Sequence, residues 1–257
     1  MKVLVIGGCG FIGSFLCKSL CNLNFQVDVF DLKNGDLENV KYLKIFDCKD
    51  YDLIFHLGGV SSVKSGYENP LKTSEDISFL VNILESIQNT KTKLVYASSF
   101  MVFSKELSPY SLSKNTCENY CRIYSKRCNV SIARIANVYP NPNGNICNLI
   151  KQKKQNESIL IFGDGEQKRD FVHVEDVVSA LIKISNMICS TYHICSGELK
   201  SFNQLASLLE AKVKYIPFSY KEDVENFPQV NPDIEDWIPH NKIENYLKEN
   251  ANSWSEK

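Results

Sequence analysis

The sequence predicts an α/β fold: a doubly wound parallel sheet with a small C-terminal lobe. Three observations support this prediction. Short β-rich segments alternate with helical segments through residues 1–135. A glycine-rich turn separates the first β-rich segment from the first helical one. The length of 257 residues suits one sizeable core with a small second lobe.

The expected elements come one after another in a regular order. A strand at Lys2–Ile6, a helix at Ser14–Cys21 and a strand at Gln26–Leu32 form a βαβ unit. Further strands are expected at Tyr42–Phe46, Leu53–Leu57, Lys93–Ala97 and Val130–Ile135. Helices are expected between them at Glu75–Gln88 and Ser111–Cys128. Alternation of this kind indicates parallel strands covered by helices on both faces.

The pattern changes after Asn137. The segment Tyr139–Gly144 (YPNPNG) is rich in turn residues, and residues 151–157 (KQKKQNE) form a polar run. A helical segment (VEDVVSALIKI) and a strand (TYHIC) return after Phe171, followed by a helix near Ser201–Glu210. We therefore expect a first domain over residues 1–138, with 171–196 returning to it, and a small lobe of 139–170 and 197–257.

The composition excludes several classes of function. A formal net charge of -1 gives no electrostatic reason to expect nucleic acid or an anionic membrane as a partner. No segment approaches the roughly 18 apolar residues of a membrane span, so a soluble, cytoplasmic protein is expected. The ten cysteines include no CxxC pair and have no histidines at zinc-ligand spacing, which favours buried reduced thiols and no metal site.

The glycine turn indicates a Rossmann-type dinucleotide site. Gly7, Gly10 and Gly13 form a GxxGxxG pattern, in which glycine allows a tight turn and close approach of the backbone to a pyrophosphate. Asp31 ends the second strand, eighteen residues past Gly13, where a carboxylate binds ribose hydroxyls and repels a 2′-phosphate. This pattern favours NAD over NADP, although an aspartate at that position also suits a simple strand-end turn.

A second group of residues suits proton transfer. Tyr110 and Lys114 are four residues apart at the start of a helix and hence on one face. A phenol is a poor base at neutral pH, and a neighbouring ammonium stabilises its phenolate form. Ser99 ends a strand, at the edge where an open parallel sheet meets its ligand. Taken alone, Tyr110 and Lys114 could also be an ordinary pair on a helix surface. Ser99 taken alone could be a strand-end cap.

Together these residues resemble the extended short-chain dehydrogenase/reductases, in particular the NAD-dependent epimerase/dehydratase group that acts on nucleotide sugars. The resembling segments are, in chain order, GGCGFIG (7–13), Asp31, Asp47, HLGGVSSVKSGYENP (56–70), YASS (96–99), PYSLSK (109–114), RIANVY (134–139) and GDGEQKRDFVHVEDV (163–177). Several such motifs in one order are far more specific than any one of them.

The resemblance implies a role for each matching residue. The implied catalytic residues are Ser99, Tyr110 and Lys114, with Ser99 also contacting substrate, and Asn137, Asn148 and Arg169 contact the nucleotide diphosphate of the substrate. The implied cofactor-binding residues are Gly7, Gly10, Phe11, Ile12, Gly13, Asp31, Leu32, Asp47, Cys48, Leu57, Gly58, Gly59, Ala97, Tyr110 and Lys114. A homodimer using the helix at 111–128 is also implied.

The residues after Ser99 bear on the reaction. Dehydratases and decarboxylases of this family have an acidic residue there, whereas this chain has Phe100 and Met101, which transfer no proton. The resemblance therefore implies a nucleotide-sugar 4-epimerase that oxidises its substrate transiently to a 4-keto sugar, with UDP-sugars favoured over dTDP- or GDP-sugars. The alternatives are an NAD(H)-dependent 4-reductase or dehydrogenase and a non-catalytic NAD-binding scaffold or sensor.

Three departures from the family pattern accompany the resemblance. The segment between Ser99 and Tyr110 is short, and the C-terminal lobe is abbreviated. Asp76 and Phe79 stand where the family commonly has asparagine and glycine, in the helix beneath the cofactor. The shortened lobe bears on the choice of sugar.

Overall fold

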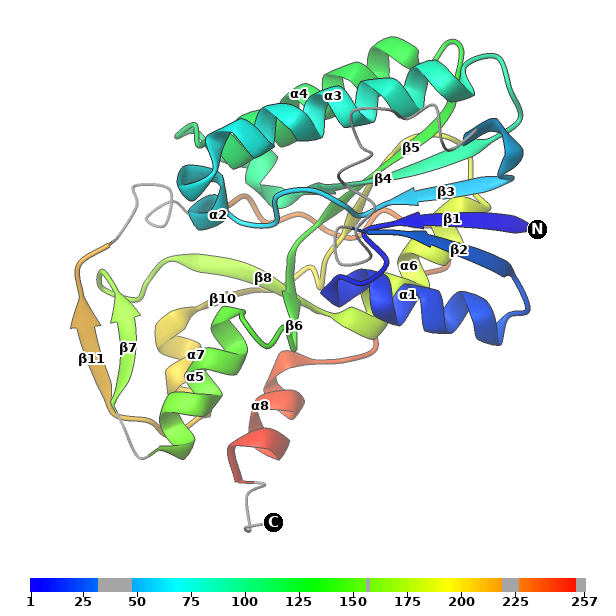
Figure 1. Ribbon diagram of the computed structural model, residues 1–257. Coiled ribbons are helices and arrows are strands. Elements are labelled where there is room, and N and C mark those ends of the chain that lie inside the picture. The colour runs from blue at the N-terminus through cyan, green and yellow to red at the C-terminus, as the bar shows by residue number, and fades with distance from the viewer. Residues whose placement is uncertain (32–47, 156–157, 219–226, 253–257) are drawn as a thin grey trace. The chain divides into compact units, whose positions relative to one another are not determined.

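The computed structural model describes residues 1–31, 48–155, 158–218 and 227–252. The chain divides into two compact units (Figure 1). The first contains residues 1–102, 107–134 and 178–192, and the second contains residues 103–106, 135–177 and 193–257. The strand predicted at Tyr42–Phe46 lies outside the described residues.

A six-stranded sheet forms the centre of the first unit and confirms the predicted α/β fold class. Its order is β2-β1-β3-β4-β5-β9, and the β1–β2, β1–β3 and β3–β4 pairs are parallel. The strands are β1 (Lys2–Ile6), β2 (Gln26–Phe30), β3 (Leu53–His56), β4 (Lys93–Ser99), β5 (Asn129–Ile135) and β9 (Thr191–Ile194).

The register of these strands determines where the chain leaves the sheet. Ile6 pairs with both Phe30 and His56, and His56 pairs with Tyr96, so these four residues form one row across the sheet. Because the strands are parallel, the residues after this row emerge at the same carboxyl edge.

Helices cover both faces of this sheet. Figure 1 shows α3 and α4 side by side on one face and α1 on the other. Leu4 and Ile6 lie in the core cluster together with residues of α3 and α4. Val3 and Val5 alternate with them and are fully buried, as expected for a parallel sheet covered on both sides. The helices are α1 (Phe11–Asn22), α2 (Val63–Glu68), α3 (Pro70–Ile87), α4 (Pro109–Tyr124) and α6 (Val174–Ser185), with short 3-10 turns η3 (Cys48–Asp50) and η4 (Phe100–Phe103).

Three helices begin earlier than the periodicity predicts: α1 starts at Phe11 rather than Ser14, and the other two start with a proline. Helix α3 starts at Pro70 rather than Glu75, and α4 starts at Pro109 rather than Ser111. Proline suits the first turn of a helix, because the N–H that it lacks would have no partner within the helix. A proline at the first helical position does not belong to the apolar repeat. A prediction from apolar periodicity therefore starts α3 and α4 too late.

The second unit contains two small sheets and a core of its own. One sheet has the order β10-β8-β6, and β11 pairs with β7 in the other. Its elements are β6 (Asn137–Tyr139), α5 (Asn145–Lys154), β7 (Ile159–Phe162), β8 (Lys168–His173), β10 (Leu199–Ser201), α7 (Phe202–Leu208), β11 (Val213–Ile216) and α8 (Ile243–Asn252). Tyr139, Phe171 and Leu247 are among its buried core residues. Within the described ranges, no helix has both the length and the apolar character needed to cross a membrane.

His56 is a buried titratable group at the end of β3. Its ring makes edge-to-face contacts with Phe79 and Tyr96, with centroid distances of 5.4 and 5.6 Å. Its Nδ1 has no hydrogen-bond partner in the part of the chain that the structure describes. Burial, with a smaller contribution from the charge of Lys114, lowers the pKa of His56 to about 3.

We predict that this histidine makes folding sensitive to acid. Between pH 6.5 and about 3 the unfolded chain binds a proton at residue 56 that the folded protein does not. The free energy of unfolding should therefore fall as the pH drops below 6.5, by up to about 1.4 kcal/mol per pH unit from this group. His56→Phe keeps a ring and removes the titration, so urea unfolding at several pH values should show a flatter decline. Identical pH dependence in the two proteins would contradict this prediction.

Candidate active site

The turn between β1 and α1 requires glycine at particular positions. Gly7 has a φ of +82°, a conformation that favours glycine. The N–H of Gly10 donates to the carbonyl oxygen of Gly7 over 3.0 Å. A Cβ on Gly13 would lie 2.1 Å from that same oxygen, so helix and turn approach too closely for a side chain there.

The start of α1 is suited to an anion. Gly10 is the N-cap residue and makes no side-chain cap hydrogen bond. The first N–H groups of a helix lack partners within it and carry the positive end of its dipole. The first helical residues here are Phe11, Ile12 and Gly13. The backbone of this turn therefore fits the pyrophosphate of a dinucleotide.

Asp31 lies beside the same turn. Its Oδ2 accepts a hydrogen bond from the N–H of Cys9 over 2.9 Å, which ties the end of β2 to the glycine turn. The role of this carboxylate in binding ribose stays a prediction. The side chain of Cys48 is fully buried in the hydrophobic core. Leu32 and Asp47 lie outside the described residues.

The segment after β3 packs against the glycine turn. A Cβ on Gly7 would lie 2.6 Å from the backbone nitrogen of Gly58. Gly59 has a φ of +123°, and a Cβ there would lie 2.8 Å from Oδ2 of Asp76. The same Oδ2 accepts the N–H of Val60 over 2.7 Å. Asp76 therefore anchors this segment to α3, while burial raises the pKa of its carboxyl group.

The start of α4 is held in place by a capping box. The side-chain oxygen of Ser108 accepts the N–H of Ser111 over 3.0 Å, and the N–H of Ser108 donates to Oγ of Ser111 over 2.9 Å. Gly66 of α2 packs against this end, since a Cβ on it would lie 3.0 Å from the backbone nitrogen of Tyr110. Capping and close packing together fix the position of Tyr110 in the first turn of the helix.

Lys114 connects α4 to the end of β4. Its side chain is buried, and Nζ donates to the carbonyl oxygen of Ala97 over 3.0 Å. Nζ also lies 5.9 Å from the ring centroid of Tyr110 and 5.1 Å from that of Tyr96. The ammonium of Lys114 therefore lies near the rings of both tyrosines.

Ser99 is the last residue of β4, two residues after the carbonyl that Lys114 contacts. Its Oγ accepts the N–H of Met101 over 3.2 Å, at the start of η4. The structure thus brings Tyr110 and Lys114 together directly and connects them to the strand end that carries the serine.

The substrate-binding candidates lie in the second unit. The guanidinium carbon of Arg169 is 4.6 Å from the ring centroid of Phe227, and Nη1 donates to the carbonyl of Lys168. The side-chain amide of Asn137 donates to the carbonyl of Asp170 over 3.1 Å. Asn148 is exposed on α5. The role of these residues in binding substrate stays a prediction.

Asp170, next to Arg169 in β8, stabilises a turn of the second unit. Its carboxylate accepts the N–H groups of Ser196 and Gly197 over 2.7 and 2.8 Å. Burial raises the pKa of Asp170 to about 6, although these hydrogen bonds oppose the increase.

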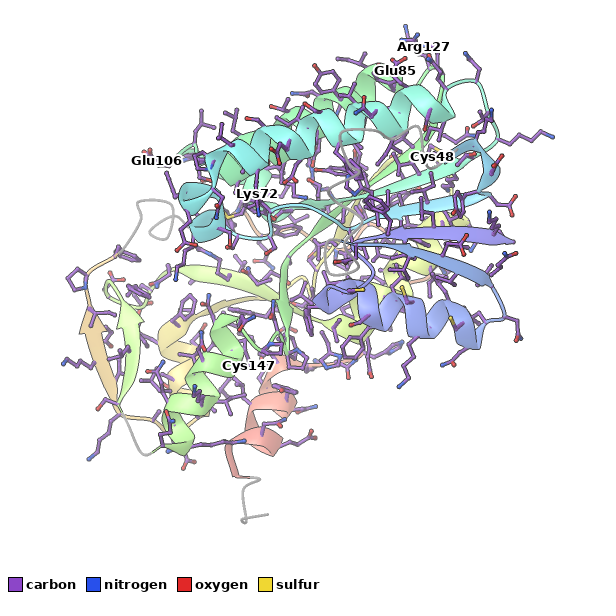
Figure 2. All side chains as sticks on the ribbon, viewed as in Figure 1. Cys48, Lys72, Glu85, Glu106, Arg127 and Cys147 are labelled. Atoms are coloured by element: carbon purple, nitrogen blue, oxygen red, sulfur yellow. The ribbon has the colours of Figure 1, made fainter. Side chains whose placement is uncertain are left out.

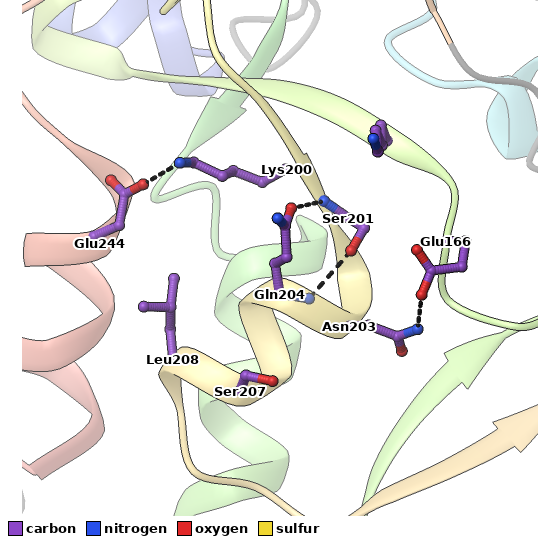
Figure 3. Close-up of a pocket in the computed structure, with 9 residues that line it drawn as sticks. Glu166, Lys200, Ser201, Asn203, Gln204, Ser207, Leu208 and Glu244 are labelled. Carbon is purple, nitrogen blue, oxygen red and sulfur yellow. Dashed lines mark hydrogen bonds and ion pairs between the residues drawn. The ribbon is translucent and has the colours of Figure 1, made fainter.

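A groove with a volume of about 620 Å³ also lies in the second unit (Figure 3). Lys200 pairs with Glu244, and the side-chain amide of Asn203 donates to Glu166. Ser201 and Gln204 form a capping box, in which each side chain accepts the backbone N–H of the other residue. Arg169, Asn137 and Asn148 are not among its lining residues.

Sequence reasoning assigned no role to several residues around the candidate site. Asp76 is recognisable in the sequence only as a departure from the family pattern, and no motif considered above assigns a role to Glu118 or Gly66. Glu118 lies four residues after Lys114, which continues the spacing of Tyr110 and Lys114, so the signal was present. In the described part of the chain, no three His, Cys, Asp or Glu side chains are grouped so as to hold a metal ion.

Comparison with known proteins identifies the family. Residues 3–194 match the model of the NAD dependent epimerase/dehydratase family. The chain belongs to this family. It is therefore an NAD-dependent enzyme of the extended short-chain dehydrogenase/reductase type, which confirms the predicted resemblance, enzyme class and cofactor.

Individual relatives and solved structures agree with this membership. A Methanocaldococcus jannaschii protein named "Putative UDP-glucose 4-epimerase" is 31% identical over 253 residues, which cover 83% of each chain. A UDP-N-acetyl-alpha-D-glucosaminuronate decarboxylase of Bacillus cytotoxicus is 26% identical, covering 91% of this chain and 89% of that protein.

Two crystal structures share the fold. The UDP-glucose 4-epimerase of Thermotoga maritima, solved with UDP-glucose, aligns with a TM-score of 0.85 at 23% identity and covers 98% of this chain and 97% of its own. The UDP-glucuronic acid 4-epimerase of Bacillus cereus, in complex with UDP-glucuronic acid and NAD, aligns with a TM-score of 0.79 at 23% identity, covering 98% of both chains.

We predict that Gly10→Ala separates cofactor binding from folding. A Cβ on Gly10 meets only the carbonyl oxygen of Gly7, at 3.1 Å, so the chain accommodates it with a small shift. The methyl group would obstruct the approach of a pyrophosphate to the turn, and the dissociation constant of NADH should rise at least about tenfold. Fluorescence titration with NADH measures this, and thermal unfolding is the control. Unchanged NADH affinity in the folded variant would show that the turn does not contact the phosphates.

Proposed function

We propose that this protein catalyses the 4-epimerisation of a nucleotide sugar, with UDP-sugars as the favoured substrates. The observation that carries the proposal is the placement of Lys114 between Tyr110 and the end of β4. Its ammonium is 5.9 Å from the Tyr110 ring and bonds the Ala97 carbonyl, two residues before Ser99. Relatives named as UDP-glucose and UDP-glucuronate 4-epimerases support the substrate class.

Three residues would carry the proton chemistry. The phenolate oxygen of Tyr110 takes the proton of the sugar 4-hydroxyl and later returns it. The ammonium of Lys114 stabilises that phenolate, and the hydroxyl of Ser99 binds the reacting oxygen. NAD held at the glycine turn would supply the chemistry of accepting and donating a hydride, with no net change in cofactor. Turning the sugar between the two steps inverts the configuration at C4.

The remaining candidates would hold the two ligands. The turn of Gly7, Gly10 and Gly13 binds the pyrophosphate of NAD, and Asp31 binds the adenosine ribose. The further cofactor contacts of this proposal are Phe11, Ile12, Leu32, Asp47, Cys48, Leu57, Gly58, Gly59 and Ala97. Asn137, Asn148 and Arg169 of the second unit bind the nucleotide diphosphate, for which a guanidinium is well suited.

The residues after Ser99 favour epimerisation over elimination or decarboxylation. Phe100 is buried and Met101 is half-buried, and neither side chain transfers protons. Relatives include decarboxylases, for which an additional acid or base would be needed at this point.

The direct test is incubation of the purified protein with UDP-, dTDP- and GDP-sugars. Anion-exchange chromatography should reveal a C4 epimer of one UDP-sugar, while absorbance of the nicotinamide at equilibrium stays constant. Stoichiometric formation or loss of NADH would instead identify a reductase or dehydrogenase.

We predict that Tyr110→Phe abolishes turnover without loss of cofactor. Removing the hydroxyl deletes the acid–base group and keeps the ring beside Lys114, so turnover should fall by about 1,000-fold or more. NADH titration should show that the cofactor still binds, since the glycine turn and the ring at residue 110 are kept. Wild-type turnover in this variant would eliminate Tyr110 as the acid–base group and would favour a non-catalytic NAD-binding role.

We also propose a homodimer formed through α3 and α4. Leu71 of α3 and Leu112 and Ile123 of α4 are more than half exposed, which is unusual for so many large apolar side chains on adjacent helices. Ile123→Glu should convert a dimer to a monomer in light scattering, whereas Ile188→Glu, at a still more exposed apolar position outside these helices, should not. A wild-type protein that is monomeric at all concentrations would disprove the dimer.

A further inference from the structure

The side chain of Glu118 is completely buried and receives four hydrogen bonds. Oε1 accepts Oγ of Ser98 at 2.7 Å and Nε of Arg134 at 2.9 Å. Oε2 accepts Nη2 of Arg134 at 2.7 Å and Nη2 of Arg122 at 2.5 Å. A buried carboxylate is costly unless every oxygen is satisfied, and here each oxygen accepts from two donors. Burial alone would raise the pKa of Glu118, but the hydrogen bonds from Arg134 and Ser98 lower it.

These donors come from three different elements of the first unit. Ser98 belongs to β4, Arg134 to β5 and Arg122 to α4 itself. The bond between Ser98 and Glu118 therefore joins the end of β4 to the inner face of α4. The two-point contact with Arg134 fixes the orientation of the carboxylate, because a guanidinium fork matches a carboxylate in one plane.

The location of this network connects it to the candidate catalytic residues. Tyr110, Lys114 and Glu118 lie at intervals of four on the same face of α4. Ser98 immediately precedes Ser99. Two bonds in consecutive helical turns thus hold β4 to α4: Lys114 to the Ala97 carbonyl, and Ser98 to Glu118.

We infer that Glu118 is a positioning residue, whose carboxylate sets the distance between the strand end that carries Ser99 and the helix face that carries Tyr110 and Lys114. The inference rests on the proposed function for the roles of those three residues. All four hydrogen bonds that the Glu118 carboxylate accepts come from protein side chains. Its effect passes through the backbone at Ser98 and through the helix between Glu118 and Lys114.

Glu118→Gln tests this role with little change in volume. The amide presents an N–H₂ group to a guanidinium or hydroxyl partner and leaves Arg134 without its anion. A displacement of about 1 Å in a catalytic group lowers turnover by about 100-fold. We therefore expect kcat to fall by about 100-fold, with KM for the converted UDP-sugar and the dissociation constant of NADH within about threefold of wild type. Ser98→Ala removes one hydrogen bond only and should lower kcat by about tenfold.

Two variants serve as matched controls. Arg122→Gln removes the more exposed arginine, whose side chain is 48% exposed against 18% for Arg134, and leaves the link to β4 intact. Glu85→Gln removes another carboxylate bound to α4, the acceptor for the hydroxyl of Tyr124. Figure 2 shows Glu85 and Arg127 near the same end of the α3–α4 pair, with Lys72 toward the other. Both controls should retain kcat within about threefold of wild type.

Hydrogen exchange measured by mass spectrometry gives a readout that does not depend on turnover. Glu118→Gln should increase exchange in peptides covering residues 96–101 and 108–115, while the β1 peptide stays at the wild-type rate. If the wild type converts a UDP-sugar and Glu118→Gln keeps kcat within about threefold, the positioning role is wrong and the proposed function stands. If Glu85→Gln loses as much kcat as Glu118→Gln, the positioning role of Glu118 would also be overturned.

The failure of the proposed function gives a different result. If the wild type converts no sugar nucleotide, the epimerase assignment fails, and exchange alone decides the role of the carboxylate. A local increase around residues 96–101 and 108–115 would then support Glu118 as the link between β4 and α4. An unchanged exchange pattern would overturn that link. If Glu118→Gln does not fold, Ser98→Ala is compared with Arg122→Gln instead. A larger loss of kcat, or a larger local increase in exchange, in Ser98→Ala would support the positioning role of Glu118, and equal effects in the two variants would overturn it.

Discussion

The parallel register of four strands is the constraint on which the candidate site depends. Phe30, Ile6, His56 and Tyr96 lie in one row across β2, β1, β3 and β4. Parallel strands send the chain out at the same edge, so the residue after each member of the row enters one region. Those residues are Asp31, Gly7, Leu57 and Ala97. A shift of register in any one strand would remove its contribution from the group.

Helix α4 places two charged side chains, Lys114 and Glu118, four residues apart on the face that meets β4. Lys114 and Glu118 are both buried, and each is hydrogen-bonded to protein groups. Lys114 bonds a backbone carbonyl of β4, and Glu118 bonds a serine of β4 and an arginine of β5. Polar contacts of this kind have a single good geometry, whereas apolar packing tolerates small shifts. Charged side chains therefore align the helix with the strands more strictly than its apolar face does.

Close backbone contact complements these charges. At Gly7, Gly13 and Gly59 an added Cβ would lie within 3 Å of neighbouring atoms, and two of these residues have positive φ. Asp76 matches this arrangement because its carboxylate accepts the N–H of Val60 and lies against Gly59. Asp76 stands where the family commonly has asparagine, and both side chains carry an oxygen that can accept the N–H of Val60.

Much of the first unit was predictable because its signals are local. Strands β1, β3 and β5 agree with their predicted ranges within one residue, since short apolar runs with β-branched residues favour a strand over a helix. The starts of α3 and α4 were missed, because an N-terminal proline breaks no periodicity. In the second unit, β6 and β10 have three residues each, too few for any pattern, and exist only through their pairing with β8.

The sequence by itself determined the alternation of strands and helices, the glycine turn, and the spacing of Tyr110, Lys114 and Glu118, because each depends on residues close together in the chain. Only the tertiary structure decided which partners these residues meet. Glu118 and Ser98 are twenty residues apart, and Asp76 and Val60 are sixteen apart. Such contacts depend on register and helix packing, which arise from the burial of the whole core rather than from any local pattern.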